Sequence, residues 1–424
     1  MTFILFLIDR KVRRGFALGA AVAVCLVAGL SGCGSSTSST KTTTSGIKKR
    51  VLLSNQFSSV LQLLDAQNDK FVTTIGVNAP TRLLTRSIVT AALDSSSNTV
   101  ALIDNPTEKV KQEPALPGAI TDIALSSDGK TAYAALRNIG QLAIINVPDG
   151  SVTAVAIPSV ARLVLSPNNT RLLAFSDDPQ HLPAGNADSF YVLDTASHAL
   201  VLKAGDAGAQ PYTAVFSGSD NQAFILNCAG ECGGTAPSAS IRPVDLTNVL
   251  APALGTPVPL PGAGATVGFL NGTNLFVAGT FFAGPTTPGV GTLVVVNTAA
   301  SPMVVSSPLT IPDGLHTRMA LTSNNRLYVG STGCLPVPVG SSFQGCLAIF
   351  DTTKGVTQTA IAMPTFNVFR SSFSVTGLQP ISGRNVIYVV EGGELDIFDI
   401  TTNALAPTQL DVIGVAIDVV QIDP

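Results

Sequence analysis

A short apolar segment that ends in Asp or Asn recurs eight times along this chain of 424 residues. Each segment is rich in β-branched side chains and is followed by a turn-forming sequence, which is typical of a β-strand. The spacings between segment ends run from 39 to 54 residues, and such a period predicts the four-stranded blades of a β-propeller. The segments end at Asp65, Asp104, Asn146, Asp194, Asp245, Asn297, Asp351 and Asp399.

One complete repeat can be followed from Ile120 to Pro158. Its four expected strands are Ile120–Ser126, Thr131–Leu136, Gln141–Asn146 and Ser151–Ile157. We expect the terminal Asp or Asn of each third strand to accept a hydrogen bond from the backbone amide two residues on, which fixes the following turn. These eight residues are therefore interpreted as structural, although most of them are carboxylates.

The composition agrees with an all-β fold. Only 12% of the residues are charged, whereas a helical bundle or coiled coil needs many charges on its outer faces. The 38 Gly and 27 Pro supply turns, and a hydrophobic fraction of 46% is too high for a disordered chain. The mean hydropathy of +0.40 is attributed to the N-terminal segment and to many short buried strands.

A family resemblance supports this interpretation. The segment Ser126–Val152, SSDGKTAYAALRNIGQLAIINVPDGSV, resembles the YVTN-type β-propeller repeat, whose unit runs SPDGKRLYVAN…VSVIDTATGKV. Ser166–Ser176 and Thr322–Ser331 resemble degenerate copies, and the pattern covers nearly all of residues 50–424. The resemblance implies a β-propeller fold. The absence of Trp departs from the WD-repeat propellers.

Eight third strands predict eight blades, with seven as the alternative because YVTN-type propellers commonly have seven. The repeat opens at Arg50–Asn55 with a second strand, so its inner strand is missing at that end. We expect Val415–Ile422 to supply it. One blade built from both termini then closes the ring and leaves no free sheet edge.

The N-terminal residues have the pattern of a secretory signal: a basic cluster at residues 10–14, the apolar stretch Gly15–Leu30 and small residues after it. The end of this segment, Leu30-Ser31-Gly32-Cys33, resembles the bacterial lipobox, in which the Cys is lipidated. The expected organisation is a signal peptide at 1–32, a Ser/Thr-rich flexible tether at 33–48 and the propeller at 49–424. An uncleaved transmembrane anchor is the alternative.

This organisation predicts an extracytoplasmic protein of the bacterial cell envelope, held to the membrane only by lipid on Cys33. Gly34 after that Cys favours the outer membrane, by resemblance to enterobacterial sorting. Residues 51–424 hold 16 Lys and Arg against 26 Asp and Glu, a net charge of about −10. An acidic body without a basic stripe is not suited to nucleic acid.

The remaining cysteines form two local pairs, Cys228 with Cys232 and Cys334 with Cys346. In an exported protein such pairs predict two loop-closing disulfides, with buried free thiols as the alternative. A zinc site is disfavoured, because the spacings are irregular and no His lies beside them.

Candidate binding residues lie in the connections between second and third strands, which share one face of a propeller with the starts of the inner strands. Four of these connections are long and form a candidate binding wall: Asp177–Asp188, Ala229–Pro237, Phe282–Gly291 and Gly333–Gly345. Their polar candidates are Asp177, Asp178, His181 and Glu231. The spacing of the acidic residues fits no EF-hand, so we expect no metal there.

A second group of candidates lies at the mouth of the central channel. Arg82, Asp122, Arg162 and Arg318 occupy similar positions at the starts of inner strands, with His316 and Arg370 nearby. Arginines gathered in this way would bind a carboxylate or phosphate. The alternative is that each Arg pairs with an acid of a neighbouring blade.

Catalytic motifs are missing from the sequence: it has no G-x-S-x-G elbow, no H-E-x-x-H and no phosphate-binding Gly loop followed by a helix. We therefore expect a non-catalytic binding or scaffolding module without a cofactor, whose partner is an envelope protein, a peptide or a glycan. The alternative, from fold analogy alone, is a hydrolase of the sugar-lactonase type.

Overall fold

The computed structural model of the protein describes residues 44–94, 97–177, 189–205, 209–248, 250–283, 289–311, 315–332, 346–354, 374–407 and 410–423. These residues belong to one compact unit, Thr43–Pro424. They form short antiparallel strands and two single-turn 3₁₀ helices, η1 (Arg137–Ile139) and η2 (Ala229–Cys232). No helix in this part of the chain is long and apolar enough to cross a membrane.

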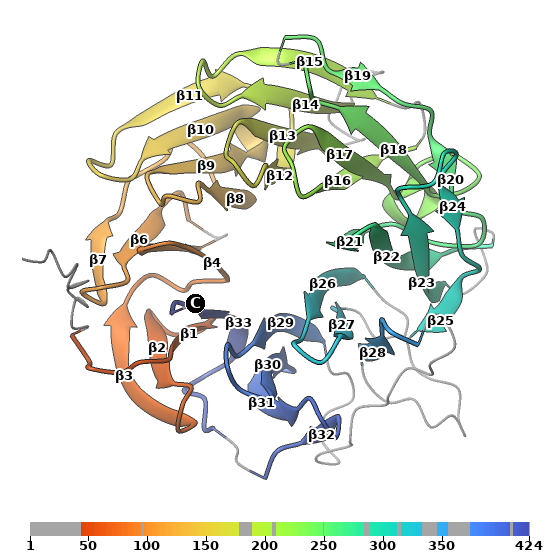
Figure 1. Ribbon diagram of the computed structural model, residues 1–424. Helices are drawn as coiled ribbons and strands as arrows, with labels where there is room; N and C mark the ends of the chain where they lie inside the picture. The colour runs from red at the N-terminus through yellow and green to blue at the C-terminus, as the bar shows by residue number, and fades with distance from the viewer. Residues whose placement is uncertain are drawn as a thin grey trace, which may run out of the picture. The chain divides into compact units, whose positions relative to one another are not determined.

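The strands form eight separate antiparallel sheets arranged as a ring (Figure 1), so the prediction of an eight-bladed propeller is confirmed and the seven-bladed alternative is wrong. We number the blades from the one that contains both ends of the repeat. Blade 1 contains β33 (Ala416–Gln421), β1 (Arg50–Asn55), β2 (Val60–Asp65) and β3 (Lys70–Gly76), and blade 2 contains β4 (Arg82–Arg86), β5 (Val89–Leu93), β6 (Val100–Asp104) and β7 (Lys109–Gln112). Blade 3 contains β8 (Asp122–Leu125), β9 (Thr131–Leu136), β10 (Gln141–Asn146) and β11 (Val152–Ala156). Blade 4 contains β12 (Val160–Leu165), β13 (Arg171–Ser176), β14 (Ser189–Asp194) and β15 (Leu200–Gly205).

The other four blades follow the same order. In blades 5 and 6 two short strands share the fourth position, and in blade 7 the described residues form three strands. Blade 5 contains β16 (Pro211–Phe216), β17 (Gln222–Asn227), β18 (Ser240–Asp245), β19 (Ala253–Leu254) and β20 (Val258–Pro259). Blade 6 contains β21 (Val267–Asn271), β22 (Asn274–Phe281), β23 (Val290–Asn297), β24 (Val304–Val305) and β25 (Leu309–Ile311). Blade 7 contains β26 (His316–Leu321), β27 (Arg326–Ser331) and β28 (Leu347–Asp351), and blade 8 contains β29 (Val375–Pro380), β30 (Val386–Glu391), β31 (Glu394–Asp399) and β32 (Ala404–Leu405).

The recurring Asp or Asn ends the third strand of every blade, as the repeat predicts. In five blades its side-chain oxygen accepts from the amide two residues on; an example is the 2.7 Å bond from the Thr401 amide to Asp399 Oδ1. Hydrogen bonds from the Thr401 hydroxyl and amide lower the pKa of Asp399. Asp104 and Asp194 instead accept from the amide three residues on, and Asn146 donates its side-chain amide to Asp149. These side chains therefore fix turns, as expected.

Ring closure also occurs as predicted, in blade 1. The C-terminal strand β33 pairs antiparallel with β1, with Val51 opposite Gln421 and Leu52 opposite Val420. The two ends of the repeat thus form a single sheet (Figure 1), in which β33 covers the edge of β1 and supplies the inner strand.

The hydrophobic core is divided among the interfaces between neighbouring blades. Eight clusters of buried side chains fill these interfaces; the one between blades 2 and 3, for example, contains Leu102, Ile123 and Ile145. Blades covered on both faces explain the near-continuous apolar runs in the second and third strands, and apolar burial supplies the main stabilisation.

One expected loop is shorter than predicted. The connection Phe282–Gly291 was expected to be irregular, but β23 begins at Val290, and pairs extend outward to Thr280 opposite Gly291 and Phe281 opposite Val290. Gly291 lacks a side chain, and its low strand propensity predicts a loop residue. In the structure it is opposed by Thr280, one pair from the outer end of a regular ladder, so cross-strand pairing overrides that propensity.

Candidate functional site

The predicted ring of charged residues lies at the starts of the inner strands. Arg82 pairs with Leu93, Asp122 with Ala135, Arg162 with Phe175 and Arg318 with Gly330, each near the end of the adjacent second strand. The four residues therefore occupy equivalent rungs of four different blades, which confirms the positions inferred from the sequence. Arg370 lies outside the described residues.

These rungs surround a cavity of about 430 Å³ at the mouth of the channel. Its charged lining residues, which we call the charged collar, are Arg82, Asp122, Arg137, Arg162, Asp177 and Arg318. The volume lies within the usual range for small-molecule sites. Two strands have a bulge just before their collar Arg, one between Val160 and Arg162 and one between His316 and Arg318. Bulges re-aim side chains at the ends of strands.

Arg82, Arg162 and Arg318 each pair with a carboxylate, but only the partner of Arg82 belongs to a neighbouring blade, as the alternative predicted. Asp177 follows β13 in the blade of Arg162 itself, and Asp418 lies in blade 1, two blades from Arg318. Arg82 pairs with Asp122 of the next blade. Arg162 Nη2 lies 2.7 Å from Asp177 Oδ2, and Arg318 Nη2 lies 3.3 Å from Asp418 Oδ2. The collar is therefore a set of ion pairs and not a ring of isolated cations.

The acids of two of these pairs lie deeper than their arginines. The Asp122 carboxylate accepts hydrogen bonds from the amides of Ile123 and Leu163, at 2.7 and 2.8 Å. Asp418 accepts similarly from Val419 and from Leu83, at 3.0 Å each. These bonds join adjacent blades and occupy the carboxylates.

In these two pairs the arginine side chain is much more exposed than the carboxylate. The side chains of Arg82 and Arg318 are 34% and 29% exposed, whereas those of Asp122 and Asp418 are 6% and 7% exposed. At these two pairs the cavity therefore presents guanidinium groups, with the carboxylates held behind them against backbone amides. The Asp177 side chain, in contrast, is 25% exposed, about as much as that of Arg162 at 27%.

Arg162 contacts an aromatic ring as well as a carboxylate. Its guanidinium carbon lies 3.5 Å from the ring centroid of Tyr212, a cation–π geometry. Its Nη2 binds Asp177, whereas its Nη1 is buried without a hydrogen-bond partner. The Asp177 carboxylate is shared with Arg137, whose Nε lies 3.1 Å from Oδ1.

Sequence reasoning missed three members of this site: Arg137, Tyr212 and Asp418. Arg137 lies in η1, directly after a second strand, and Tyr212 is the residue inserted by a bulge in β16. Neither position has a sequence signal. Asp418 had one, because Asp418-Val419 in the closing inner strand repeats the Asp122-Ile123 pattern of β8.

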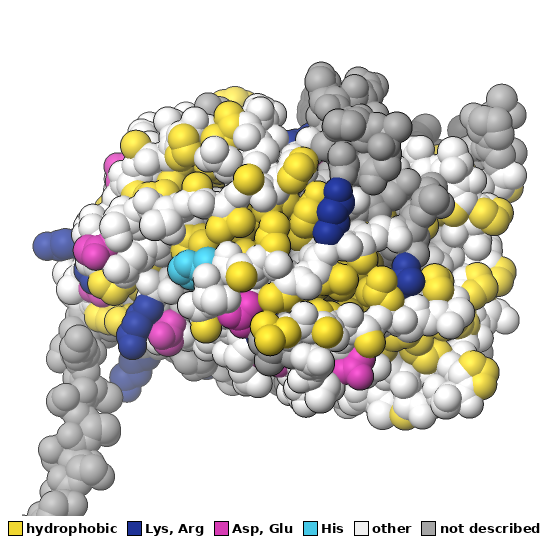
Figure 2. All heavy atoms as spheres, turned by 90° about the horizontal axis from the view of Figure 1, so that it is seen from above, with side chains coloured by type: hydrophobic (Ala, Val, Ile, Leu, Met, Phe, Trp, Pro, Cys, Tyr) yellow, Lys and Arg dark blue, Asp and Glu magenta, His cyan; other side chains and the backbone are white. Residues whose placement is uncertain are grey.

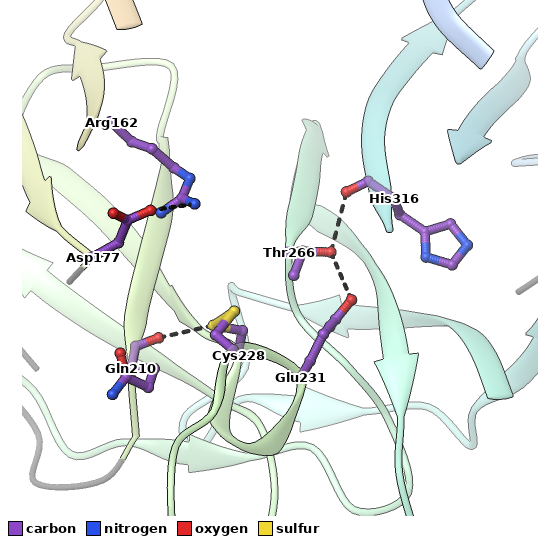
Figure 3. Close-up of a disulfide and its surroundings, with 8 residues drawn as sticks. Arg162, Asp177, Gln210, Cys228, Glu231, Thr266 and His316 are labelled. Atoms are coloured by element: carbon purple, nitrogen blue, oxygen red, sulfur yellow. Dashed lines mark hydrogen bonds and ion pairs between the residues drawn. A yellow bond between two sulfur atoms is a disulfide. The ribbon is translucent and has the colours of Figure 1, made fainter. Parts of the chain in front are cut away.

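The disulfide predicted between Cys228 and Cys232 is present, with a Cα–Cα distance of 5.7 Å. It encloses η2, which carries Glu231 toward blade 6 (Figure 3). The Cys228 amide donates to the Gln210 carbonyl at 3.0 Å. Cys334 lies outside the described residues, so its predicted pairing with the buried Cys346 stays a prediction.

Glu231 does not line the collar cavity; its carboxyl group is inserted between blades 5 and 6. A Cβ at Gly264 or Gly279 would lie only 2.7 or 2.5 Å from Glu231 Oε2, so both positions leave the space that the carboxyl group needs. Burial raises the pKa of Glu231 to about 7, although hydrogen bonds from Thr280, Thr266 and Ala265 partly oppose this shift.

Thr266 connects Glu231 to blade 7. The Thr266 hydroxyl oxygen lies 3.3 Å from Glu231 Oε1 and 3.1 Å from the carbonyl oxygen of His316 (Figure 3). The Thr266 hydroxyl has only one proton to donate, so it cannot donate to both oxygens. If Glu231 is protonated, its carboxyl group can donate to the Thr266 hydroxyl, which then donates to the His316 carbonyl. His316 is buried, and it is not among the residues that line the collar cavity.

The predicted polar wall can be followed only in part. Asp178 and His181 lie outside the described residues, as do most of residues 177–188 and 333–345. Within the described ranges, no three His, Cys, Asp or Glu side chains gather as metal ligands would. Figure 2 shows charged side chains of both signs spread singly among apolar and uncharged ones over the face in view.

Comparisons with known proteins identify the fold. No protein-family model matches the chain, and no curated protein matches it by sequence, so the YVTN resemblance stays a prediction. Solved structures do match: dihydro-heme d1 dehydrogenase NirN in complex with DHE has a TM-score of 0.64 at 11% identity, over 89% of this chain and 75% of that one. These matches show the fold alone.

Two further structures are similar over almost their whole length. Apo AztD from Citrobacter koseri has a TM-score of 0.59 at 14% identity and covers 88% of this chain and 97% of its own. A functionally unknown protein from Desulfotomaculum acetoxidans has a TM-score of 0.52 at 11% identity, with coverage of 88% and 99%. At such identities no functional residue can be transferred.

Proposed function

We propose that this chain is a lipid-anchored, extracytoplasmic β-propeller that binds a ligand bearing a carboxylate or phosphate group at its charged collar, without catalysis. The observation that carries the proposal is the difference in exposure within the collar. Guanidinium groups face the cavity, while the carboxylates of Asp122 and Asp418 lie behind them.

The charges of this region support anion binding. Four arginines lie around the cavity, and three carboxylates pair with them: Arg82, Arg137, Arg162 and Arg318 against Asp122, Asp177 and Asp418. The backbone amides already bound to two of the acids reduce what those acids offer to a ligand. A guanidinium has five donors, so each collar Arg retains N–H groups beyond its ion pair.

Rigidity is the second support. Four collar residues lie at the starts of strands of separate blades, Arg82, Asp122, Arg162 and Arg318. Buried apolar clusters fix these blades, and a site on such elements is held more precisely than a site on loops. The partner classes expected from the sequence, an envelope protein, a peptide or a glycan, can all present a carboxylate or phosphate group.

Arg162→Gln is expected to weaken the binding of citrate and inorganic phosphate by about tenfold or more, because it removes a charge-assisted hydrogen bond from the collar. Isothermal titration calorimetry at low salt measures the effect. Lys130→Gln is the matched control, because the Lys130 side chain is 73% exposed in a turn away from the cavity. Equal affinities for the wild type and Arg162→Gln would contradict the proposed site.

Cys33→Ala is expected to move the protein from the membrane fraction to the soluble extracytoplasmic fraction, because the lipid is the proposed anchor. Fractionation followed by immunoblotting checks this outcome, and Cys25→Ala within the signal is the matched control. Unchanged membrane association of the Cys33 variant would reject the lipid anchor and leave collar binding untouched.

A further inference from the structure

A second cavity, of about 610 Å³, adjoins the charged collar inside the channel. The two cavities share lining residues from four inner strands: Arg82, Leu163, Val164, Ala214 and Gly268. The collar cavity thus continues into the second cavity along the inner strands of blades 2 and 4 to 6.

The lining of the second cavity is mainly apolar and is organised in a layer. Five of its residues lie on equivalent rungs, two residues beyond the collar rung of their own strands. Residues two apart on a strand share a face, so this layer follows the collar around one side of the channel. We call it the apolar waist: Leu84, Ala124, Val164, Val215 and Phe269.

Packing within the protein covers the waist only in part. Its four larger side chains pack against the clusters between blades and stay only partly buried, whereas Ala124 is buried. Apolar side chains that face a cavity favour the binding of an apolar ligand, because binding removes apolar area of both the protein and the ligand from water. Beyond the waist the lining turns polar again, with Arg86, Ser127 and Asn169.

We propose that the ligand is a single-chain amphiphile, with a carboxylate held at the charged collar and an apolar chain in the apolar waist. This inference rests on the proposed function and deepens it by naming the ligand class. Cations at the mouth with an apolar lumen directly behind them match the two ends of such a molecule. A fully polar anion would leave the waist unfilled.

The test is calorimetric titration with straight-chain carboxylates from butanoate to decanoate, each below its micelle concentration, with octan-1-ol and octyltrimethylammonium as comparisons. Affinity is expected to rise roughly three- to fourfold per methylene until the waist is filled. Octan-1-ol and the cationic analogue are expected to bind at least tenfold more weakly than octanoate, because neither offers an anion to the arginines.

Two variants locate the chain. Leu84→Gln is expected to remove most of the chain-length dependence while leaving citrate binding unchanged, and the milder Val164→Thr is expected to reduce it in part. Leu200→Gln on the outermost strand of blade 4 is the control, because Leu200 is an exposed apolar side chain away from the channel. Retained thermal unfolding temperatures show that the variants fold.

The outcomes separate the two proposals. Citrate binding without any gain from chain length overturns the amphiphile and leaves the anion site standing. Octan-1-ol binding as tightly as octanoate, or a chain-length series that is unaffected by Arg162→Gln, overturns the role of the collar in holding the amphiphile. The anion site itself is decided separately, by the citrate titration of Arg162→Gln. If none of these probes binds, both proposals are overturned.

Discussion

Arg50→Ala is expected to lower the free energy of unfolding by about 3–5 kcal/mol, since it breaks a buried ion-pair network at the seam of the ring. The Arg50 side chain lies 3.0 Å from Glu108 Oε1 in blade 2 and 2.7 Å from Asp423 Oδ1 after the closing strand. It also donates to the Asn105 carbonyl. Arg50 and Glu108 are almost fully buried, so removing the Arg leaves a buried carboxylate without its counter-charge.

Equilibrium urea denaturation followed by circular dichroism measures this loss. Lys130→Ala is the matched control, because Lys130 pairs with Asp128 at the surface, 3.7 Å away, and such pairs contribute about 1 kcal/mol or less. The double variant Arg50→Met with Glu108→Gln is expected to recover part of the loss, because no unpaired charge remains buried. A change below about 1 kcal/mol for Arg50→Ala would show that the seam does not depend on this network.

Glu231→Gln is expected to stabilise the protein by about 3 kcal/mol at pH 8 and to change little at pH 5. Burial between blades 5 and 6 raises the pKa of Glu231 to about 7, from an ordinary value of 4.5. The folded state therefore keeps its proton over a pH range in which the unfolded state has lost it. Stability from this group is present below about pH 4.5 and is lost as the pH rises through 7.

Glutamine has the shape of the protonated acid and does not ionise, so the variant escapes that loss. The measurement is the difference in urea midpoint between wild type and variant at intervals from pH 4.5 to pH 8.5. Glu113→Gln, at an exposed site of blade 2, is the control that should show no such trend. A difference that stays constant with pH would mean that Glu231 is ionised in the folded state throughout.

Local features of the sequence were sufficient for most of the fold. Asp65, Asp351 and Asp399 end their third strands where the repeat places them, because a side-chain oxygen that caps a turn acts on residues two positions away. The predicted end of the Phe282–Gly291 connection was wrong, because Gly291 is held in β23 by its pairing with a residue eleven positions earlier.

The candidate site was less accessible from sequence. The equivalent positions of Arg82, Arg162 and Arg318 followed from the repeat, but their partners did not. Asp177 lies fifteen residues after Arg162, and Asp418 lies one hundred residues after Arg318, in a strand that returns to close the ring. A 3₁₀ turn places Arg137 in the site and a bulge places Tyr212 there, and the repeat pattern predicts neither feature.

The eight blades, the turn at the end of each third strand and the closure by both termini can all be predicted from the amino-acid sequence. These features depend on alternation, turn chemistry and period, which act within a few residues or repeat along the chain. Three features emerge only from the packing of the blades: Asp122 and Asp418 lie behind their arginines, Glu231 is buried with a raised pKa, and an apolar waist adjoins the collar. Those features depend on how neighbouring blades twist and register against one another, and residues far apart in sequence meet only there.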